Sequence, residues 1–297
     1  MEEIKQCNIC GNAEFSVYIE CRDHFMTREL FTIAKCKKCG FLFINPRPEK
    51  DKLHSYYDSP EYISHSGTSN GLVNSIYKKV RNYTHKKKFK IISKYAKGKT
   101  ILDVGCGSGE LLNLFKHHNW ETIGIEPNPK AREFAKLSYG LKILEETQIG
   151  NIPEKSVDVV TLWHVLEHVS GLNERMHELK RILKNDGVLI IAVPNCISYD
   201  ATYYGKYWAA YDVPRHLYHF TPNTMKQLLN KFQFSITNIL PMKFDSYYVS
   251  MLSEKYKSGR TNIIKALFVG LKSNIRACKD KTSYSSQIYI IKNSEFL

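Results

Sequence analysis

The segment that constrains the fold most is Ile101-Leu102-Asp103-Val104-Gly105-Cys106-Gly107-Ser108-Gly109. Four residues with strand character lead into three glycines at alternate positions, and a helical pattern begins at Glu110. Glycine lets the backbone turn sharply there and approach a ligand where a Cβ would stand in the way. The free N–H groups at the start of the next helix favour a carboxylate or another anion. The segment therefore predicts a strand–turn–helix unit that binds a small molecule.

From Thr100 onward the chain alternates between short apolar runs and amphipathic stretches. Strands are expected at five apolar, mostly β-branched places: residues 101–104, 122–125, 141–144, 157–162 and 188–193. Helices are expected at three places: from residue 110, over 129–139, and over 173–184 with Asn185-Asp186-Gly187 closing it. Strands that alternate with helices of about 10–15 residues form parallel βαβ units. The expected fold class is therefore α/β, with a doubly wound, mainly parallel sheet. A helix at 221–231 and two late strands at 234–240 and 287–291, an antiparallel pair at one sheet edge, complete the expectation.

Glu126 follows the second expected strand, seventeen residues after Gly109. A carboxylate at this place accepts hydrogen bonds from ribose hydroxyls. Dinucleotide-binding turns have the spacing G-x-G-x-x-G, whereas this turn has G-x-G-x-G preceded by Asp103, and a second acid would repel a pyrophosphate. Residues 103–109 resemble the first motif of the class I S-adenosylmethionine-dependent methyltransferases, D-x-G-x-G-x-G. The resemblance extends over about residues 100–297 and implies a seven-stranded, Rossmann-like sheet with S-adenosylmethionine as cofactor.

In that family, the turn after the first strand surrounds the methionine end of the cofactor, and the acid after the second strand holds its ribose. The resemblance therefore implies a first set of cofactor-binding residues: Asp103, Gly105, Cys106, Gly107, Gly109 and Glu126. Glu146 follows the third strand, where the family often has an acid near the adenine, and an ordinary surface acid is the alternative. Trp163 and His164 end the fourth strand and would lie beside the cofactor. Tyr62 resembles tyrosines that related enzymes lay over the cofactor, as does the pair Tyr56-Tyr57, with interdomain packing as the alternative.

Residues 164–168 read His-Val-Leu-Glu-His, which also matches the H-x-x-E-H pattern of a group of zinc proteases. That interpretation needs both histidines on one helix face. Here His164 is expected at a strand end, and only Glu167-His168 begin the next helix. Because short motifs match by accident, the strand-end segment of a methyltransferase is the favoured interpretation.

Residues 195–222 are expected to form a loop that carries the acceptor site, because ligands bind beyond the carboxyl ends of parallel strands. The segment W-x-x-x-D-x-P-R-H within it is similar to segments of bacterial methyltransferases with an N-terminal four-cysteine module. Four residues are substrate-binding candidates because they are aromatic, amide-bearing or able to clamp an anion: Asn195, Trp208, Tyr211 and Arg215. His216 is the first candidate for the base that removes one proton from the acceptor, followed by His219 and Asp212. The alternative is structural: Arg215 and Asp212 pin the loop, and His216 caps a buried carbonyl.

Cys7, Cys10, Cys36 and Cys39 form two C-x-x-C pairs separated by twenty-five residues. Each pair is followed by a glycine, where a knuckle turns, and this spacing suits tetrahedral zinc in a ribbon of two knuckles. Four thiolates leave no open position, so the predicted Zn²⁺ is structural; four free thiols are the alternative. The other cysteines are scattered.

Three parts follow from these patterns: a zinc-ribbon-like module at residues 1–48, a helical cap or linker at 49–98, and a methyltransferase domain at 99–297. Residues 78–99 hold ten Lys or Arg and no acid, residues 255–281 are also basic, and the net charge is +14. Such surfaces attract nucleic acid, an anionic membrane surface or phosphorylated small molecules, and a solvated helix face is the plainer interpretation. The longest apolar run, about residues 188–193, is far too short to span a membrane, and the N-terminus lacks a signal-peptide pattern. A cytoplasmic protein is therefore expected.

Methyl transfer from S-adenosylmethionine to a small molecule, such as a nucleotide-linked sugar, is the leading prediction. The substrate class is implied by the resemblance, because four-cysteine modules precede this domain in several sugar-pathway and antibiotic-pathway enzymes. An RNA or DNA methyltransferase that uses the basic face and the zinc ribbon is the first alternative. It is opposed by the lack of an N/D-P-P-Y/F segment after the fourth strand and of a Pro-Cys pair after the fifth. A non-catalytic zinc-bearing binding protein is third. The oligomeric state is left open.

Overall fold

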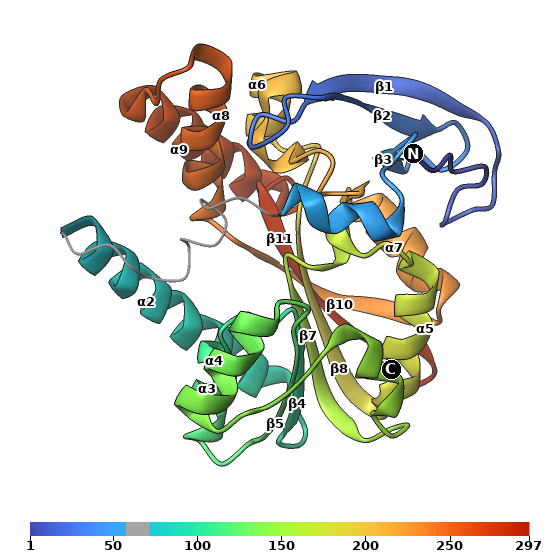
Figure 1. Cartoon of the computed structure of the whole chain (residues 1–297), viewed down its shortest axis with the longest axis vertical. Coiled ribbons are helices and arrows are strands. Elements are labelled where there is room, and N and C mark those ends of the chain that lie inside the picture. Colours follow the sequence, from blue (N-terminus) through green and yellow to red (C-terminus); the bar gives the residue numbers. More distant parts are fainter. Residues whose placement is uncertain (58–71, 297) are drawn as a thin grey trace. The chain divides into compact units, whose positions relative to one another are not determined.

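The computed structural model describes residues 1–57 and 72–296, and the side chains of the second range from residue 80 onward (Figure 1). Tyr62 and the loop expected around residues 66–71 lie outside the described residues. The described chain contains two β-sheets and a series of helices. None of its described helices has the length and apolar character needed to cross a bilayer.

The larger sheet has seven strands in the order β10-β11-β8-β7-β4-β5-β6. Their bounds are β4 Thr100–Val104, β5 Glu121–Ile125, β6 Lys142–Leu144, β7 Val157–Trp163, β8 Leu183–Pro194, β10 Phe234–Pro241 and β11 Ser286–Asn293. Parallel pairing joins β4 to β5, β4 to β7 and β5 to β6. This confirms the expected α/β fold with a seven-stranded, mostly parallel sheet.

Helices follow these strands as the βαβ pattern predicts. In chain order the α-helices are α2 Leu72–Tyr95, α3 Glu110–Lys116, α4 Pro129–Tyr139, α5 Leu172–Ile182, α6 Tyr199–Tyr204, α7 Pro222–Lys231, α8 Asp245–Ser258 and α9 Ile263–Asp280. The 3₁₀ helices are η1 Lys50–Tyr56, η2 Glu146–Asn151, η3 Leu166–His168, η4 Gly205–Tyr207, η5 Ala209–Tyr211 and η6 Ser294–Phe296. α4 begins at a proline after Asn128, whose side chain accepts from the N–H groups of Lys130 and Ala131, as helix starts commonly do.

The expected helix at 173–184 was too long. α5 stops at Ile182, and β8 already begins at Leu183 and runs through Asn185-Asp186-Gly187. These polar residues suggested a closing turn, but the strand extends beyond the apolar run that predicted it. A Cβ on Gly187 would come within 2.8 Å of the Leu183 side chain, so only glycine fits there without movement.

The smaller sheet is antiparallel, with β1 Phe15–Arg22, β2 Leu30–Cys36, β3 Leu42–Ile44 and β9 Tyr218–His219 in the order β1-β2-β3-β9. β9 lies within the stretch that the sequence predicted to be a loop, and it pairs Phe43 with Tyr218. The rings of Phe41 and Tyr218 stack at a centroid distance of 5.7 Å. Aromatic packing of this kind adds to apolar burial and fixes the short strand in place.

The chain folds into two compact units. Unit 1 comprises residues 1–59, 164–173 and 191–290, and unit 2 comprises residues 60–163, 174–190 and 291–297. Each unit is discontinuous along the sequence, whereas the expected parts 1–48, 49–98 and 99–297 were continuous. Residues 1–48 share a unit with residues 191–290, because β3 pairs with β9 and because Phe31, Ile33, Leu42 and Ile44 belong to the same core cluster as Trp208 and Tyr211.

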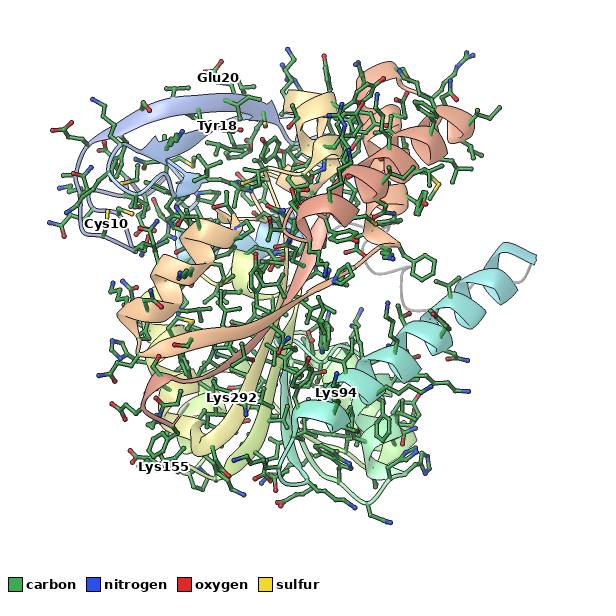
Figure 2. All side chains as sticks on the ribbon, turned by 180° about the vertical axis from the view of Figure 1, so that it is seen from behind. Cys10, Tyr18, Glu20, Lys94, Lys155 and Lys292 are labelled. Atoms are coloured by element: carbon green, nitrogen blue, oxygen red, sulfur yellow. The ribbon has the colours of Figure 1, made fainter. Side chains whose placement is uncertain are left out.

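Unit 2 holds the glycine-rich turn. Lys94 lies in the last turn of α2 (Figure 2), where a cation interacts favourably with the helix dipole. The ring of Phe89 on α2 contacts Phe115 on α3 and His118, which lies just after α3. Arg81 and Glu110 add an ion pair at 2.9 Å between the same two helices. The basic helix therefore has a buried side as well as exposed lysines.

Candidate functional site

The glycine-rich turn joins β4 to α3 in unit 2. Gly107 and Gly109 have φ values of +54° and +78°, which side-chain-bearing residues rarely adopt. A Cβ on Gly109 would come within 2.7 Å of Leu141 Cδ1 and 3.0 Å of Ala135 Cβ. At Gly107 no atom lies within 4 Å of where a Cβ would be. Gly109 is therefore needed for close packing, whereas Gly107 borders open space that a ligand can occupy.

Glu126 joins this turn from the end of β5. The N–H of Gly107 donates to its Oε2 at 2.8 Å, and the N–H of Asn128 donates to its Oε1 at 2.9 Å. Burial raises the pKa of Glu126, and these two backbone donors oppose that shift. The turn and the acid thus form one polar cradle, in which a carboxylate suited to ribose hydroxyls lies beside a backbone free of side chains. These residues fit an adenosyl cofactor.

Asp103 lies on β4, two residues before the glycine-rich turn begins. It is opposite Thr161 on β7 and accepts a hydrogen bond from the Thr161 hydroxyl. Burial raises the pKa of Asp103 to about 6, against the effects of Thr161 and Lys88. Gly105 and Cys106 both donate their N–H groups to the carbonyl of Ile125. This first part of the motif shapes the turn, which is consistent with the predicted role in cofactor binding.

The remaining cofactor candidates of unit 2 have partners of their own. The ammonium group of Lys88 lies 4.2 Å from the ring centroid of Trp163. Glu146 forms an ion pair with Arg175 at 2.5 Å, and half of its side chain is exposed. An exposed ion pair of this kind is expected if Glu146 is an ordinary surface acid and does not contact the adenine.

His164, the last cofactor candidate, belongs to a partly exposed cluster of charged residues in unit 1. It follows β7 with a left-handed φ of +56°, and its two ring nitrogens lie 3.4 Å from Glu167 Oε1 and 3.2 Å from Asp245 Oδ2. Burial alone would lower the pKa of His164, but Asp245 and Glu167 raise it to about 10. The residue is therefore an imidazolium at neutral pH.

A second group of titratable residues shares Glu167. Glu167, His168 and His216 each place a ligand atom within 4.8 Å of the others. His168 Nδ1 lies 3.1 Å from the carbonyl oxygen of Arg215 and 2.9 Å from Tyr57 Oη. His216 Nδ1 lies 2.8 Å from the carbonyl oxygen of Ala210. An Nδ1–H donated to a carbonyl leaves Nε2 of that ring as the basic nitrogen, so this group can accept a proton.

The same group could hold a metal. Two imidazoles and a carboxylate are a donor set for Zn²⁺ or Fe²⁺, and the histidines have the carbonyl partners that orient such ligands. The pairing differs from the H-x-x-E-H arrangement of proteases: His168 meets His216 from a distant segment, whereas His164 faces Asp245.

Arg215 is held by acidic partners. Its guanidinium donates to Asp212 and to Asp23, with Nη2 contacts of 2.6 Å and 2.9 Å, and Nη1 donates to the carbonyl of Tyr56. Its side chain is 2% exposed, and that of Asp23 is fully buried. These contacts favour the structural alternative, in which Arg215 and Asp212 pin the loop, over binding of a substrate anion.

The other acceptor candidates are also buried in unit 1. Asn195 donates its side-chain amide to the carbonyls of Thr282 and Tyr284. Trp208 donates its indole N–H to Asp200. One small hollow is lined by Trp208, Tyr211, Asp212 and Arg215, together with His24 and Tyr256.

His219 and Asp212 are weaker base candidates than His216. Burial, and then the neighbouring His216, lowers the pKa of His219 to about 3. Asp212 is bound by the guanidinium of Arg215 through both carboxylate oxygens. The side chain of His216 is 12% exposed, and its Nε2 lies 3.9 Å from Asp212 Oδ2, within ion-pair distance of a protonated ring.

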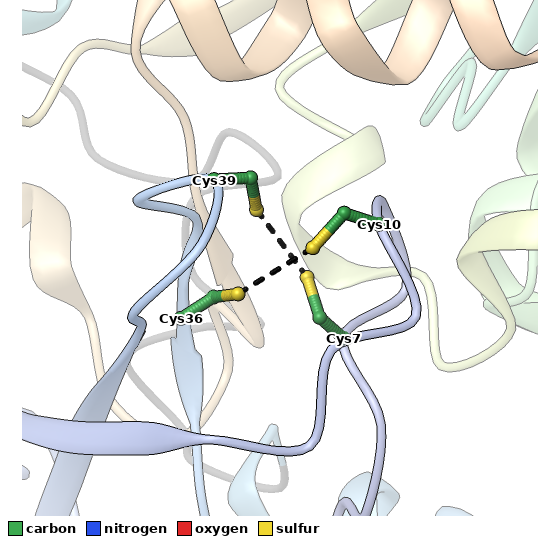
Figure 3. A group of neighbouring side chains, drawn as sticks. All are labelled: Cys7, Cys10, Cys36 and Cys39. Carbon is green, nitrogen blue, oxygen red and sulfur yellow. Dashed lines mark hydrogen bonds between the residues drawn. The ribbon is translucent and has the colours of Figure 1, made fainter.

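The four predicted metal-ligating cysteines converge on one point (Figure 3). Their sulfurs are 3.5 Å apart between Cys7 and Cys39 and 3.6 Å apart between Cys10 and Cys36, and no disulfide joins any of the four. Tetrahedral coordination with Zn–S bonds of about 2.3 Å puts the sulfurs about 3.8 Å apart. Gly11 and Gly40 follow the pairs with φ of +70° and +78°, as zinc knuckles require. The donor set therefore fits Zn²⁺.

Comparison with known proteins decides the family. The sequence pattern of a methyltransferase domain matches residues 79–239, more than half of the chain. The chain belongs to this methyltransferase-domain family. The matched region of this methyltransferase domain contains the whole turn–Glu126 cradle and ends within β10.

Individual relatives agree with that assignment. The chain is 26% identical over 155 residues to the ubiquinone biosynthesis O-methyltransferase of Rhodopseudomonas palustris, covering 47% of this chain and 60% of that protein. The chain thus spans about three fifths of the length of this curated relative.

Two solved methyltransferase structures show the same fold. An S-adenosylmethionine-dependent methyltransferase from Archaeoglobus fulgidus aligns with a TM-score of 0.50 at 20% identity, over 71% of this chain and 94% of that one. An enzyme from Galdieria sulphuraria described as a putative sarcosine dimethylglycine methyltransferase gives 0.52 at 11% identity, over 83% and 99%.

Sequence reasoning did not find three acidic and aromatic partners in unit 1: Asp23, Tyr57 as a partner of His168, and Asp245. Each lies far along the chain from the histidine or arginine that it contacts. A single sequence carries no signal for such pairs. The H-x-x-E-H match at residues 164–168 was the one local sign of the cluster.

Proposed function

We propose that the protein transfers a methyl group from S-adenosylmethionine to a small-molecule acceptor. The observation that carries the proposal is the cradle of Gly107 and Glu126, where open space meets a buried carboxylate in a methyltransferase domain. The name of the Rhodopseudomonas palustris relative, an O-methyltransferase of ubiquinone biosynthesis, supports a small acceptor. A nucleotide-linked sugar is the finer class that we favour.

S-adenosylmethionine supplies a methyl group that its sulfonium has already activated. When the acceptor atom attacks that carbon, its bond to the methyl group forms as the S–CH₃ bond breaks, and the electron pair stays on sulfur. The acceptor then has one proton to lose, and we assign His216 Nε2 to receive it. Nδ1 of the same ring donates its proton to the carbonyl oxygen of Ala210, and this contact fixes the tautomer needed for this step.

Nucleic acid is the second candidate acceptor, and the observation that favours it is the row of exposed lysines on α2, with Lys86, Lys87, Lys90 and Lys94. A screen with labelled cofactor should therefore include nucleotide sugars and bulk RNA side by side. Label in the sugar fraction alone supports the proposal, whereas label in RNA that declines steeply with salt supports the alternative.

Replacement of Glu126 tests the cradle. Glu126→Gln keeps the shape of the side chain and removes the charge that ribose hydroxyls and the Gly107 N–H share. We expect S-adenosylmethionine affinity to fall by about 10–100-fold, as for the loss of a charged hydrogen-bond partner. Isothermal titration calorimetry with S-adenosylmethionine and S-adenosylhomocysteine measures it.

Glu133→Gln is the matched control, because Glu133 is exposed on α4 of the same unit and should bind like the wild type. Heat with NAD but none with either adenosyl ligand would overturn the proposed function.

We further propose that Cys7, Cys10, Cys36 and Cys39 bind one structural Zn²⁺. Their geometry supports it, and a small antiparallel sheet gains most from such an ion because it buries little apolar surface of its own.

A further inference from the structure

Helix α9 presents large apolar side chains to the surface. Six of them are about half to four fifths exposed: Ile263 58%, Ile264 83%, Leu267 47%, Phe268 63%, Leu271 48% and Ile275 57%. At about 100° per residue they fall within one arc of about 140° on the helix. An arc of this width is what an amphipathic helix normally turns towards the core of its protein.

The opposite side of α9 is the one that packs within unit 1. Ala266, Gly270, Ser273 and Ala277 are buried there, and α8 and α9 lie side by side (Figure 1). A Cβ on Gly270 would come within 3.0 Å of the Tyr247 backbone, so the two helices approach closely. Because the small residues of α9 make the contact with the rest of unit 1, its large apolar side chains are free to bind another surface.

Positive charge accompanies the exposed apolar side. Residues 245–281 contain eight Lys or Arg and three acids. Each acid already has a partner: Asp245 pairs with His164, Glu254 with Lys265, and Asp280 accepts from the N–H of Thr282. On the helix, Lys272, Arg276 and Lys279 lie directly beside the apolar arc. The hairpin of α8 and α9 therefore carries an uncompensated positive charge.

We propose that α9 binds to the surface of a membrane rich in anionic lipids, with its exposed apolar side in the headgroup region and its basic flank against the phosphates. This is the arrangement of an interfacial amphipathic helix, which lies in the plane of the membrane. A second copy fits the observations less well, because pairing of identical surfaces would bring the same basic residues together on a chain of net charge +14.

Flotation of the full-length protein with lipid vesicles tests this inference without the cofactor, so its result is independent of the proposed methyl transfer. We expect binding to vesicles of phosphatidylglycerol and phosphatidylcholine, and little binding to phosphatidylcholine alone. Phe268→Ser combined with Leu271→Ser should weaken binding by about tenfold or more. Lys272→Gln combined with Lys279→Gln should weaken it by about fivefold or more for each charge removed.

Leu137→Ser is the matched control, because Leu137 is 80% exposed on α4 of unit 2 and should bind vesicles like the wild type. A Phe268→Trp variant provides a second readout: brominated lipid should quench its added fluorescence when anionic lipid is present. The inference is overturned if the wild type does not float with anionic vesicles or if Phe268→Ser with Leu271→Ser floats unchanged. It is equally overturned if sedimentation shows a dimer, or capture shows an acidic protein, that accounts for the whole effect of these substitutions.

Discussion

The imidazole of His216 has its Nδ1 2.8 Å from the carbonyl oxygen of Ala210 and its Nε2 3.9 Å from Asp212 Oδ2. Asparagine in its place can still donate to the carbonyl of Ala210 but cannot accept a proton at neutral pH. We therefore expect His216→Asn to lower kcat by about 10²–10⁴-fold, the usual contribution of a general base, while S-adenosylmethionine affinity stays the same. Steady-state kinetics and calorimetry on the same preparation measure the two quantities.

His118→Asn is the control for this substitution, because His118 also places Nδ1 near a carbonyl, that of Leu114, but is exposed. Unchanged turnover in His216→Asn would remove His216 from the mechanism.

The carboxylates of Glu167 and Asp245 beside His164 predict how the stability of the protein depends on pH. The pKa of His164 is raised above its ordinary 6.5 to about 10, so the folded state holds a proton that the unfolded state releases. The stabilisation is complete below about pH 6.5 and is lost as the pH rises towards 10. With a side chain one third exposed, it amounts to about 2 kcal/mol.

Urea unfolding of wild type and His164→Gln from pH 6 to pH 10.5 measures this effect. The wild type should be the more stable protein at pH 6, and the difference should shrink progressively as the pH rises from about 6.5 to about 10. A difference that stays constant across this range would contradict the assigned ion pairs.

At the level of elements, the sequence predicted those strands, helices and turns whose formation depends on neighbouring residues in the chain. The turn at 105–109, the strand β4 before it, the helix α3 after it and α4 with its N-terminal proline were predicted because their signals lie within a few adjacent residues. β9 was missed because two residues become a strand only when β3 is beside them. α8 and α9 were not predicted, although the apolar residues of α9 have helical spacing, because the stretch 255–281 was interpreted for its positive charge alone.

The candidate site divides in the same way. The cofactor-binding candidates around Asp103, the turn at 105–109 and Glu126 could be proposed because they lie within and just after two strands, where the resemblance to a known motif places them. The ion pair of Asp23 with Arg215 joins residues 192 positions apart, and no periodicity reports such a contact. From the sequence, Arg215 was therefore interpreted as a residue that binds a substrate anion, although its guanidinium already donates to Asp23 and Asp212.

The two cysteine knuckles predict the zinc content and the thermal stability of the protein. Purified, chelator-free protein should contain one zinc per chain, and Cys10→Ser should remove most of it and lower Tm, because three thiolates bind Zn²⁺ less tightly and the small sheet depends on the ion. Mass spectrometry of metals and a thermal melt measure these changes. Cys278→Ser, at an exposed cysteine, should leave both unchanged.

Metal that persists at one equivalent in Cys10→Ser would contradict the four-cysteine site. If His168→Ala then removed that metal, it would place the ion at the group of Glu167, His168 and His216.

At the scale of the whole molecule, unit 1 is assembled from distant stretches of chain. The N-terminal residues contribute β1 to β3 and bury Phe31, Ile33, Leu42 and Ile44 in the same cluster as Val249 and Val269 of α8 and α9. Asp23 neutralises Arg215 within that unit. The N-terminal segment that carries the four cysteines therefore packs with residues 191–290 in one unit.

A fragment that begins at residue 49 tests this organisation. It would leave β9 without its partner strand, remove Asp23 from the two carboxylates that bind Arg215, and expose the apolar cluster, which costs about 1.5–3 kcal/mol for each large apolar side chain that loses its burial. Because several such losses are comparable with the total stability of many domains, we expect residues 191–290 of the fragment to lose fixed tertiary structure. Near-ultraviolet circular dichroism should weaken, and limited proteolysis should cut this region first. Residues 100–163 keep their own strands and helices, so cleavage there should be slower. A fragment with the melting temperature and proteolytic pattern of the full chain would instead show that residues 1–48 form a separate domain, as the sequence suggested.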